Sequence, residues 1–169
     1  MNAGRAGTSD PAINLSGETI AEHYVKVLNH LIETSKNGEK GFLAAAEDAK
    51  SPELRDLFQR RAQDCASGAS EMQAIVAQAG EKPEDGGTVA GAIHRGWVNL
   101  KASVAGRTDL AILEECERGE DVAKKAFSDA LNENVPENVR AVIQRQYDGV
   151  LRNHNEVRAL RDRFKATGA

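Results

Sequence analysis

Aromatic side chains and long apolar runs are scarce in this 169-residue sequence. Aromatic residues make up 4% of it and hydrophobic residues 40%, so Leu, Ile, Val and Ala must fill the core, which favours closely packed helices. No apolar run approaches the roughly 18 residues that a membrane-spanning helix needs, and the first residues lack the pattern of a signal peptide. We therefore expect a cytoplasmic protein without a membrane partner.

An excess of positive charge and a cysteine framework are also missing. With 22 Lys and Arg against 26 Asp and Glu, the net charge of −4 argues against nucleic acid as a partner. Cys65 and Cys116 lie within helical patterns and are not spaced as a zinc or redox motif, so we expect reduced thiols in the core. The sequence contains no phosphate-binding loop or nucleophile elbow, so it does not support nucleophilic catalysis.

The pattern of apolar residues divides the chain into a tail and one helical domain. Residues 1–18 are rich in small and polar residues without periodicity, which predicts a disordered tail. In the predicted domain, residues 19–166, apolar residues recur at steps of three and four, the spacing of one helix face. The predicted helices span about 19–50, 52–79, 88–105, 109–133 and 136–165.

An internal repeat relates the first two long helices to the last two. Residues 37–39 (Asn-Gly-Glu) match 118–120 (Arg-Gly-Glu), and residues 55–60 (RDLFQR) match 140–145 (RAVIQR). Short turns make each helix pair an antiparallel hairpin, and about 29 residues with their own helix connect the two hairpins. The sequence therefore predicts an all-α fold, a ferritin-like four-helix bundle of two antiparallel hairpins with a long helical crossover.

Four segments carry a resemblance to a known family. They are Leu28–Glu33 (LNHLIE), Asn37–Phe42 (NGEKGF), Val89–Trp97 (VAGAIHRGW) and Cys116–Asp121 (CERGED). Over about residues 20–163 the sequence resembles an uncharacterised bacterial ferritin-like family, the proteobacterial four-helix-bundle proteins of unknown function. The resemblance implies a fold, and it implies no activity and no functional residues.

The centre of the predicted bundle has half of a di-metal site. Ferritin-like di-metal sites combine a Glu from each of two helices with Glu-x-x-His pairs from the other two. Glu39 and Glu120 fit the first half, because they are equivalent in the repeat and each follows a Gly. The second half is missing, since none of the four histidines has Glu or Asp three residues before it. At that depth Arg61, Gln146 and Asn153 face the bundle axis instead.

Three interpretations of this centre stay open. The first is a metal-free layer of ion pairs and hydrogen bonds, in which a guanidinium binds carboxylates. Its members are Glu39, Arg61, Glu120, Gln146 and Asn153. The second is an iron or manganese site, for which the candidate ligands are Glu39, Glu71, Glu117, Glu120 and His154. In the third, Glu39 and Glu120 point to solvent.

Two further features have both a structural and a functional interpretation. His94 and Trp97 lie on the crossover, where Trp97 either covers the bundle or borders a pocket for a small molecule or partner. Arginines of the last helix are interrupted by acidic residues, which is typical of a solvated face rather than an anion site. These arginines are Arg152, Arg158, Arg161 and Arg163.

Two functional hypotheses follow. The leading one is a non-catalytic bundle without a cofactor that acts by association, as a homo-oligomer or with a protein partner. A stress-related role for it rests only on analogy of fold. The alternative is a carboxylate-bridged iron or manganese protein with oxidase or peroxide-related activity. The missing Glu-x-x-His pairs favour the non-enzymatic hypothesis.

Overall fold

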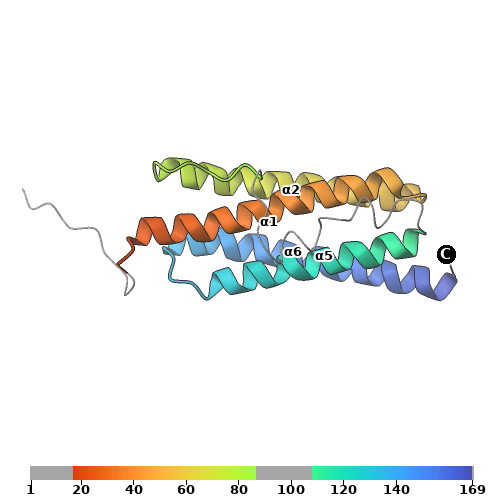
Figure 1. Ribbon diagram of the computed structural model, residues 1–169. Coiled ribbons are helices and arrows are strands. Elements are labelled where there is room, and N and C mark those ends of the chain that lie inside the picture. Colours follow the sequence, from red (N-terminus) through yellow and green to blue (C-terminus); the bar gives the residue numbers. More distant parts are fainter. Residues whose placement is uncertain (1–16, 87–107, 169) are drawn as a thin grey trace, which may run out of the picture.

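A computed structural model describes residues 17–86 and 108–168, and the four long helices of these parts form a bundle (Figure 1). The helices are α1 (Ile20–Asp48), α2 (Pro52–Gln78), α5 (Asp109–Leu131) and α6 (Glu137–Thr167). The predicted all-α, four-helix architecture is confirmed. Most of the predicted tail and the predicted crossover helix, with His94 and Trp97, lie outside the described residues.

The beginnings of α1 and α5 are fixed by local side-chain caps. The Thr19 hydroxyl accepts a hydrogen bond from the Glu22 N–H (3.1 Å), and the Glu22 carboxylate accepts one from the Thr19 N–H (2.9 Å). The Thr108 hydroxyl accepts from the Ala111 N–H in the same way (3.2 Å). Each cap satisfies N–H groups that the first turn of a helix leaves unpaired.

The repeat-equivalent arginines Arg55 and Arg140 have the same structural role. Arg55 donates to the carbonyl of Ala49 (3.0 Å), just beyond the end of α1. Arg140 donates to the carbonyls of Leu131 and Glu133 (2.8 Å for Glu133), at the end of α5. Both therefore satisfy carbonyl groups that a helix end leaves unpaired, and both lie at the turn of a hairpin.

The start of α5 is attached to the turn of the first hairpin. The Asp109 carboxylate accepts hydrogen bonds from the backbone N–H groups of Lys50 (2.8 Å) and Ser51 (2.9 Å). Since α2 also starts at this turn, α5 runs parallel to α2 and antiparallel to α1 (Figure 1). The connection from α2 to α5 therefore joins opposite ends of the bundle.

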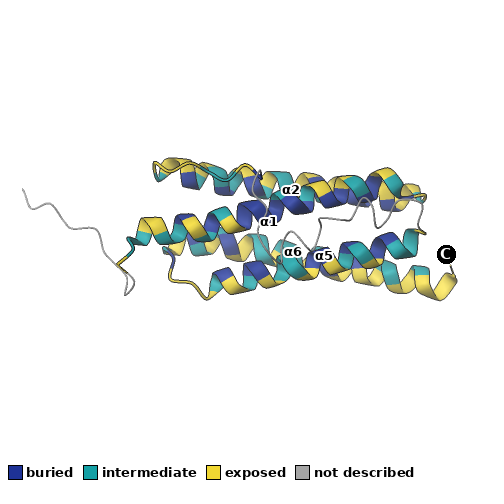
Figure 2. Ribbon diagram, in the orientation of Figure 1, coloured by how far each residue is buried: buried dark blue, intermediate teal, exposed yellow. Residues whose placement is uncertain are grey.

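Two apolar clusters fill the two ends of the bundle interior, and the buried faces of the helices point inward (Figure 2). One cluster contains Phe42, Leu54, Phe58 and Leu113, and the other contains Leu28, Ile32, Met72 and Ile143. Close packing joins α1 with α2, α5 with α6, and α1 with α5. The fourth side, between α2 and α6, is bridged mainly by polar side chains.

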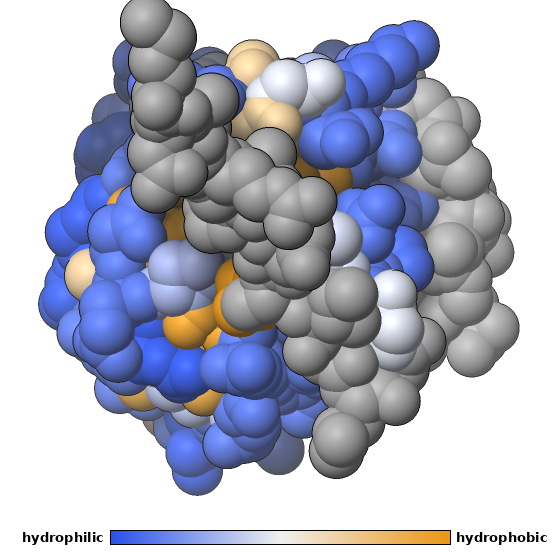
Figure 3. All heavy atoms as spheres, turned by 90° about the vertical axis from the view of Figure 1, so that its left-hand side faces the viewer, coloured by the Kyte–Doolittle hydropathy of each residue, from blue (hydrophilic) through white to orange (hydrophobic). Residues whose placement is uncertain are grey.

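The described surface is mostly polar. Leu43 is the only large hydrophobic residue of the described parts that is exposed. In the view onto the end where α1 begins, polar residues form the outer part of the face and hydrophobic residues gather toward its centre (Figure 3). None of the described helices combines the length and the apolar character needed to cross a membrane.

Candidate functional site

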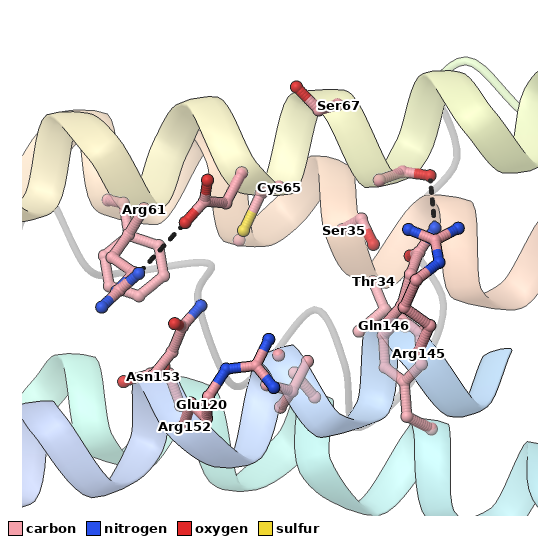
Figure 4. A pocket seen from close by; sticks show the side chains of 18 of the residues that line it. Thr34, Ser35, Arg61, Cys65, Ser67, Glu120, Arg145, Gln146, Arg152 and Asn153 are labelled. Carbon is pink, nitrogen blue, oxygen red and sulfur yellow. Dashed lines mark hydrogen bonds and ion pairs between the residues drawn. The ribbon is translucent and has the colours of Figure 1, made fainter. Parts of the chain in front are cut away.

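A pocket of about 530 Å³ lies midway along the bundle, between the two apolar clusters, and all four helices line it (Figure 4). Its lining residues from α1 and α5 are all at least partly buried. Its exposed lining residues come from α2 and α6, and they are Asp64, Ser67, Arg145 and Arg152. The pocket therefore has its floor on α1 and α5 and its mouth between α2 and α6.

Two glycines allow side chains of neighbouring helices to approach closely at the pocket wall. A Cβ at Gly38 would lie 3.0 Å from the Cys65 Sγ, and a Cβ at Gly68 would lie 2.9 Å from the Gln146 Oε1. The Gln146 amide uses this space to donate to the Gly68 carbonyl (3.2 Å). Side chains of α2 and α6 thus meet where the two backbones are not closely packed.

The carboxyl group of Glu120 is the most unusual group of the pocket. Glu120 is only 4% exposed, and its Oε1 has no hydrogen-bond partner among the described residues. Burial raises its pKa to about 8; Arg61 opposes this rise, and the carboxylates of Asp121, Glu117 and Glu156 add to it. At neutral pH the group is therefore mainly a neutral acid that can donate a hydrogen bond.

The thiol of Cys65 also lines the pocket and is also neutral. Burial, together with the carboxylates of Glu120, Asp64 and Glu39, raises its pKa to about 12. Burial likewise raises the pKa of Cys116 well above its ordinary value, in one of the apolar clusters. Both thiols are free, and neither forms the thiolate that nucleophilic or redox chemistry requires.

Glu39, the repeat equivalent of Glu120, has a different environment. Its side chain is 27% exposed and pairs with Lys36 (3.3 Å), one turn earlier on α1. It does not line the pocket. The structure therefore does not bring the two predicted glutamates together in one site.

Arg61 lines the pocket but bonds to neither predicted glutamate in the described structure. Its guanidinium pairs with Asp64 (3.0 Å) and with Glu156 of α6, and its side chain is 13% exposed. Its Nε atom is buried without a hydrogen-bond partner among the described residues. Arg61 therefore acts on Glu120 through its positive charge rather than through a direct bond.

The remaining residues of the predicted polar centre border the pocket from α6. Gln146 donates to Glu71 (3.3 Å) in addition to Gly68, and Glu71 also pairs with Arg145. Asn153 lines the pocket. In the sequence repeat, Arg61 corresponds to Gln146 and Glu156 to Glu71, so the contacts Arg61–Glu156 and Gln146–Glu71 are equivalent. The repeat thus extends to the links between the hairpins.

Like Glu39, two other predicted metal ligands lie away from the pocket. Glu117 pairs with Arg161 (2.5 Å), and the His154 Nε2 lies 2.7 Å from the Asp121 Oδ1. Neither Glu117 nor His154 lines the pocket. Each therefore takes part in a contact that joins α5 to α6.

With this geometry in place, comparison with known proteins identifies the family. The family described as "Domain of unknown function (DUF2383)" matches residues 23–133, most of the chain. This chain belongs to the DUF2383 family. The match begins within α1, covers α2 and α5, and ends before α6. The predicted membership of a family of unknown function is thereby confirmed, and no curated protein matches the sequence.

The DUF2383 chain has a ferritin-like fold. It is similar to the DPS protein from Vibrio cholerae O1, with a TM-score of 0.67 and 13% sequence identity over 90% of this chain and 99% of that chain. That protein is described as a member of a broad superfamily of ferritin-like diiron-carboxylate proteins. At this level of identity the similarity shows the fold alone, and the predicted ferritin-like bundle is confirmed.

The donor groups of the DUF2383 pocket do not fit two metal ions. Of the predicted ligands, only Glu71 and Glu120 line it, and Glu71 is held by Arg145 and Gln146. Within residues 17–86 and 108–168, no group of three or more His, Cys, Asp and Glu residues is arranged to hold a metal ion. The guanidinium of Arg61 at the same pocket would repel a dication.

Sequence reasoning missed three charged residues of the site, Asp64, Arg145 and Arg152. Arg152 was assigned to a solvated face, yet it lines the pocket mouth from α6 (Figure 4). The repeat contained a signal, because the alignment of residues 55–60 with 140–145, continued along the helices, pairs Ser67 with Arg152 and Gly68 with Asn153. All four of these residues line the pocket.

Proposed function

We propose that this DUF2383 protein is a non-catalytic binding protein whose bundle holds one small organic molecule where relatives of its fold hold metal. The observation that carries this proposal is the unpartnered, buried Oε1 of Glu120, which lines a pocket of about 530 Å³. Buried polar groups are nearly always hydrogen-bonded, so such an oxygen calls for a ligand or an ordered water. The volume lies within the range of about 300–1,000 Å³ that is typical of small-molecule sites.

The chemistry of the pocket supports binding more than reaction. The pocket offers no activated cysteine nucleophile, because burial keeps the Cys65 thiol protonated by raising its pKa to about 12. Arg61 and Arg145 are each engaged by carboxylates, which holds the mouth of the pocket in place. A neutral Glu120 and the amides of Gln146 and Asn153 offer donors and acceptors to a polar ligand.

Filling the pocket is the most direct test of this proposal. Gly149 lines the pocket on α6, so Gly149→Phe places an aromatic ring in it. The matched control is Ala141→Phe, because Ala141 is exposed on the same helix and does not line the pocket. Native mass spectrometry of protein purified without a chelator, combined with elemental analysis, would measure what is bound.

We expect a bound organic molecule in the wild type and in Ala141→Phe, its loss in Gly149→Phe, and less than stoichiometric metal in all three. Stoichiometric iron or manganese would overturn the proposal in favour of the metal hypothesis. Equal ligand retention by Gly149→Phe, with its fold intact by circular dichroism, would place the ligand elsewhere and would also overturn it.

Self-association stays a prediction. Leu43 is the only exposed large hydrophobic residue of the described parts, so an oligomer built from these parts would rely on polar contacts. Multi-angle light scattering at micromolar concentration would test it, and a strictly monomeric mass would argue against a homo-oligomer. The cytoplasmic location and the stress-related role also stay predictions.

A further inference from the structure

Arg152 is the cation of the pocket that lacks a partner in the described structure. Arg61 pairs with Asp64 and Glu156, and Arg145 pairs with Glu71. No ion pair or hydrogen bond to another described side chain is found for Arg152, whose guanidinium borders the mouth of the pocket (Figure 4). A guanidinium without an ion-pair partner can bind a carboxylate through two parallel N–H groups.

The charge of Arg152 favours an anion at the pocket mouth while Glu120 is protonated. Asp64 and Glu156 pair with Arg61, and Glu71 pairs with Arg145, so Arg152 is the lining arginine whose charge is not paired with a carboxylate of the described residues. A dianion would exceed that charge, and a cation would be repelled by it. A single negative charge on the ligand fits best.

Several charged groups act on Glu120. Arg61 of α2 favours its ionised form, while Asp121 and Glu117 of α5 and Glu156 of α6 favour its neutral form. The neutral Cys65 thiol faces it from α2, and Glu39 is the α1 carboxylate that also acts on that thiol. Burial is the largest of these influences, and together with the carboxylates it outweighs Arg61 and keeps Glu120 neutral.

The floor of the pocket adds an apolar surface. Phe42 of α1 and Phe127 of α5 are each 3% exposed, and both line the pocket, as do Ala123 and Val150. A ligand that fills the pocket therefore has to place an apolar body against these rings and a polar end toward Glu120 and Arg152. Such a division is typical of small-molecule sites, which are mainly apolar with a few polar groups that fix orientation.

We propose that the pocket binds a small monocarboxylate with an apolar body, whose carboxylate is held by Arg152 and accepts a hydrogen bond from neutral Glu120; this deepens the proposed function and rests on it. Because an ionised Glu120 would repel the ligand, binding weakens as the pH rises through the pKa of that group, about 8. The site thereby takes up its ligand at neutral pH and releases it at alkaline pH.

Isothermal titration calorimetry with four probes of equal chain length tests the ligand class. The probes are hexanoate, hexanol, hexylammonium and hexyl phosphate, each measured at pH 7 and pH 9 after removal of any co-purified ligand. At pH 7 we expect hexanoate to bind at least about tenfold more tightly than the other three, because only it matches one unbalanced guanidinium. Between pH 7 and pH 9 its affinity should fall about tenfold, as Glu120 ionises.

Three variants assign the effect to the two residues. Arg152→Gln should weaken hexanoate about tenfold at both pH values, whereas the matched control Arg158→Gln, an exposed arginine of α6 outside the pocket, should not change it. Glu120→Gln keeps a neutral hydrogen-bond donor, so it should bind hexanoate equally at pH 7 and pH 9.

The outcomes separate this inference from the proposed function. Tighter binding of hexanol, hexylammonium or hexyl phosphate that Gly149→Phe abolishes would overturn the monocarboxylate and leave the binding function intact. A pH dependence that persists in Glu120→Gln would overturn the role of Glu120. Binding of none of the four probes, together with no co-purified molecule, would overturn both proposals.

Discussion

The two hairpins carry the same glutamate at equivalent places and leave it in opposite states. Glu39 is partly exposed and pairs with Lys36, whereas Glu120 is buried and has an oxygen without a described partner. The residue equivalent to Lys36 is Glu117, whose carboxylate pairs with Arg161 and helps to raise the pKa of Glu120. The residue one turn before the glutamate is therefore a cation in the first hairpin, where the glutamate forms an ion pair. It is an anion in the second hairpin, where the glutamate is a neutral acid.

The turns of the two hairpins show the opposite behaviour. Arg55 and Arg140 both donate to carbonyls at the end of the preceding helix, so this part of the repeat kept its role. Backbone carbonyls at a helix end need donors whatever the neighbouring sequence is, because the helix leaves them unpaired. A carboxylate in mid-helix depends instead on the charges around it. Equivalent residues of the two hairpins therefore diverge in role more easily at the middle of the bundle than at its turns.

Glu120→Gln should have the largest effect on the free energy of unfolding. The pKa of Glu120 is raised from 4.5 to about 8 in the folded protein, so between these pH values the folded state binds more protons than the unfolded state. The wild type should therefore lose stability as the pH rises from 4.5 to 8, and the variant should not. At pH 9 we expect the variant to be more stable by about 2–5 kcal/mol, measured by urea denaturation.

The repeat supplies the control for this prediction. Glu39→Gln removes an equivalent glutamate that is 27% exposed and ion-paired, so the free energy of unfolding should change by less than about 1 kcal/mol. Equal effects of the two substitutions would show that the hairpins do not differ in the way described above.

Arg61→Gln makes the first hairpin resemble the second, because Gln146 is the equivalent residue. The substitution removes pairs to Asp64 and Glu156, both exposed, so it should cost about 1–2 kcal/mol of unfolding free energy. It also removes the positive charge that lowers the pKa of Glu120, which should rise. NMR titration of a protein with labelled glutamate would measure the pKa of Glu120. A lower pKa in the variant would contradict the role given to the charge of Arg61.

Substitution of either turn arginine should lower the free energy of unfolding, and the loss should be larger for Arg140 than for Arg55. Arg140→Ala removes donors to two carbonyl groups and should cost about 1–2 kcal/mol, whereas Arg55→Ala removes a donor to one and should cost about 0.5–1 kcal/mol. Chemical denaturation would rank them. A negligible loss in both would show that these contacts do not stabilise the turns.

Glu117→Lys gives the second hairpin a cation at the position of Lys36 in the first. Among these predictions we expect it to have the smallest effect, a shift in the pKa of Glu120. A positive charge one turn before Glu120 replaces a carboxylate that raises its pKa, so that pKa should fall by about one unit. The loss of stability with rising pH would then be complete at a lower pH. Thermal melts from pH 5 to pH 9 would detect the shift, and Glu117→Gln should give a smaller one.

The sequence by itself determined the architecture of this protein. The spacing of apolar residues, the capping residues and the two short turns are local features, so they predicted four long helices in two hairpins and their ferritin-like connectivity. The repeat also identified equivalent residues, among them Arg55 and Arg140 at the turns. Apart from the repeat, each of these signals depends on residues within one or two helical turns of each other.

Only the tertiary structure decided which polar residues share a site. Arg61 pairs with Asp64 and Glu156 rather than with Glu39 or Glu120, and Arg152 of an apparently solvated face borders the pocket. Periodicity defines the apolar face of a helix, but the state of a carboxyl group depends on atoms within a few Å that belong to other helices. The rotation and spacing of all four helices therefore had to be known before Glu120 could be identified as the buried acid of the pocket.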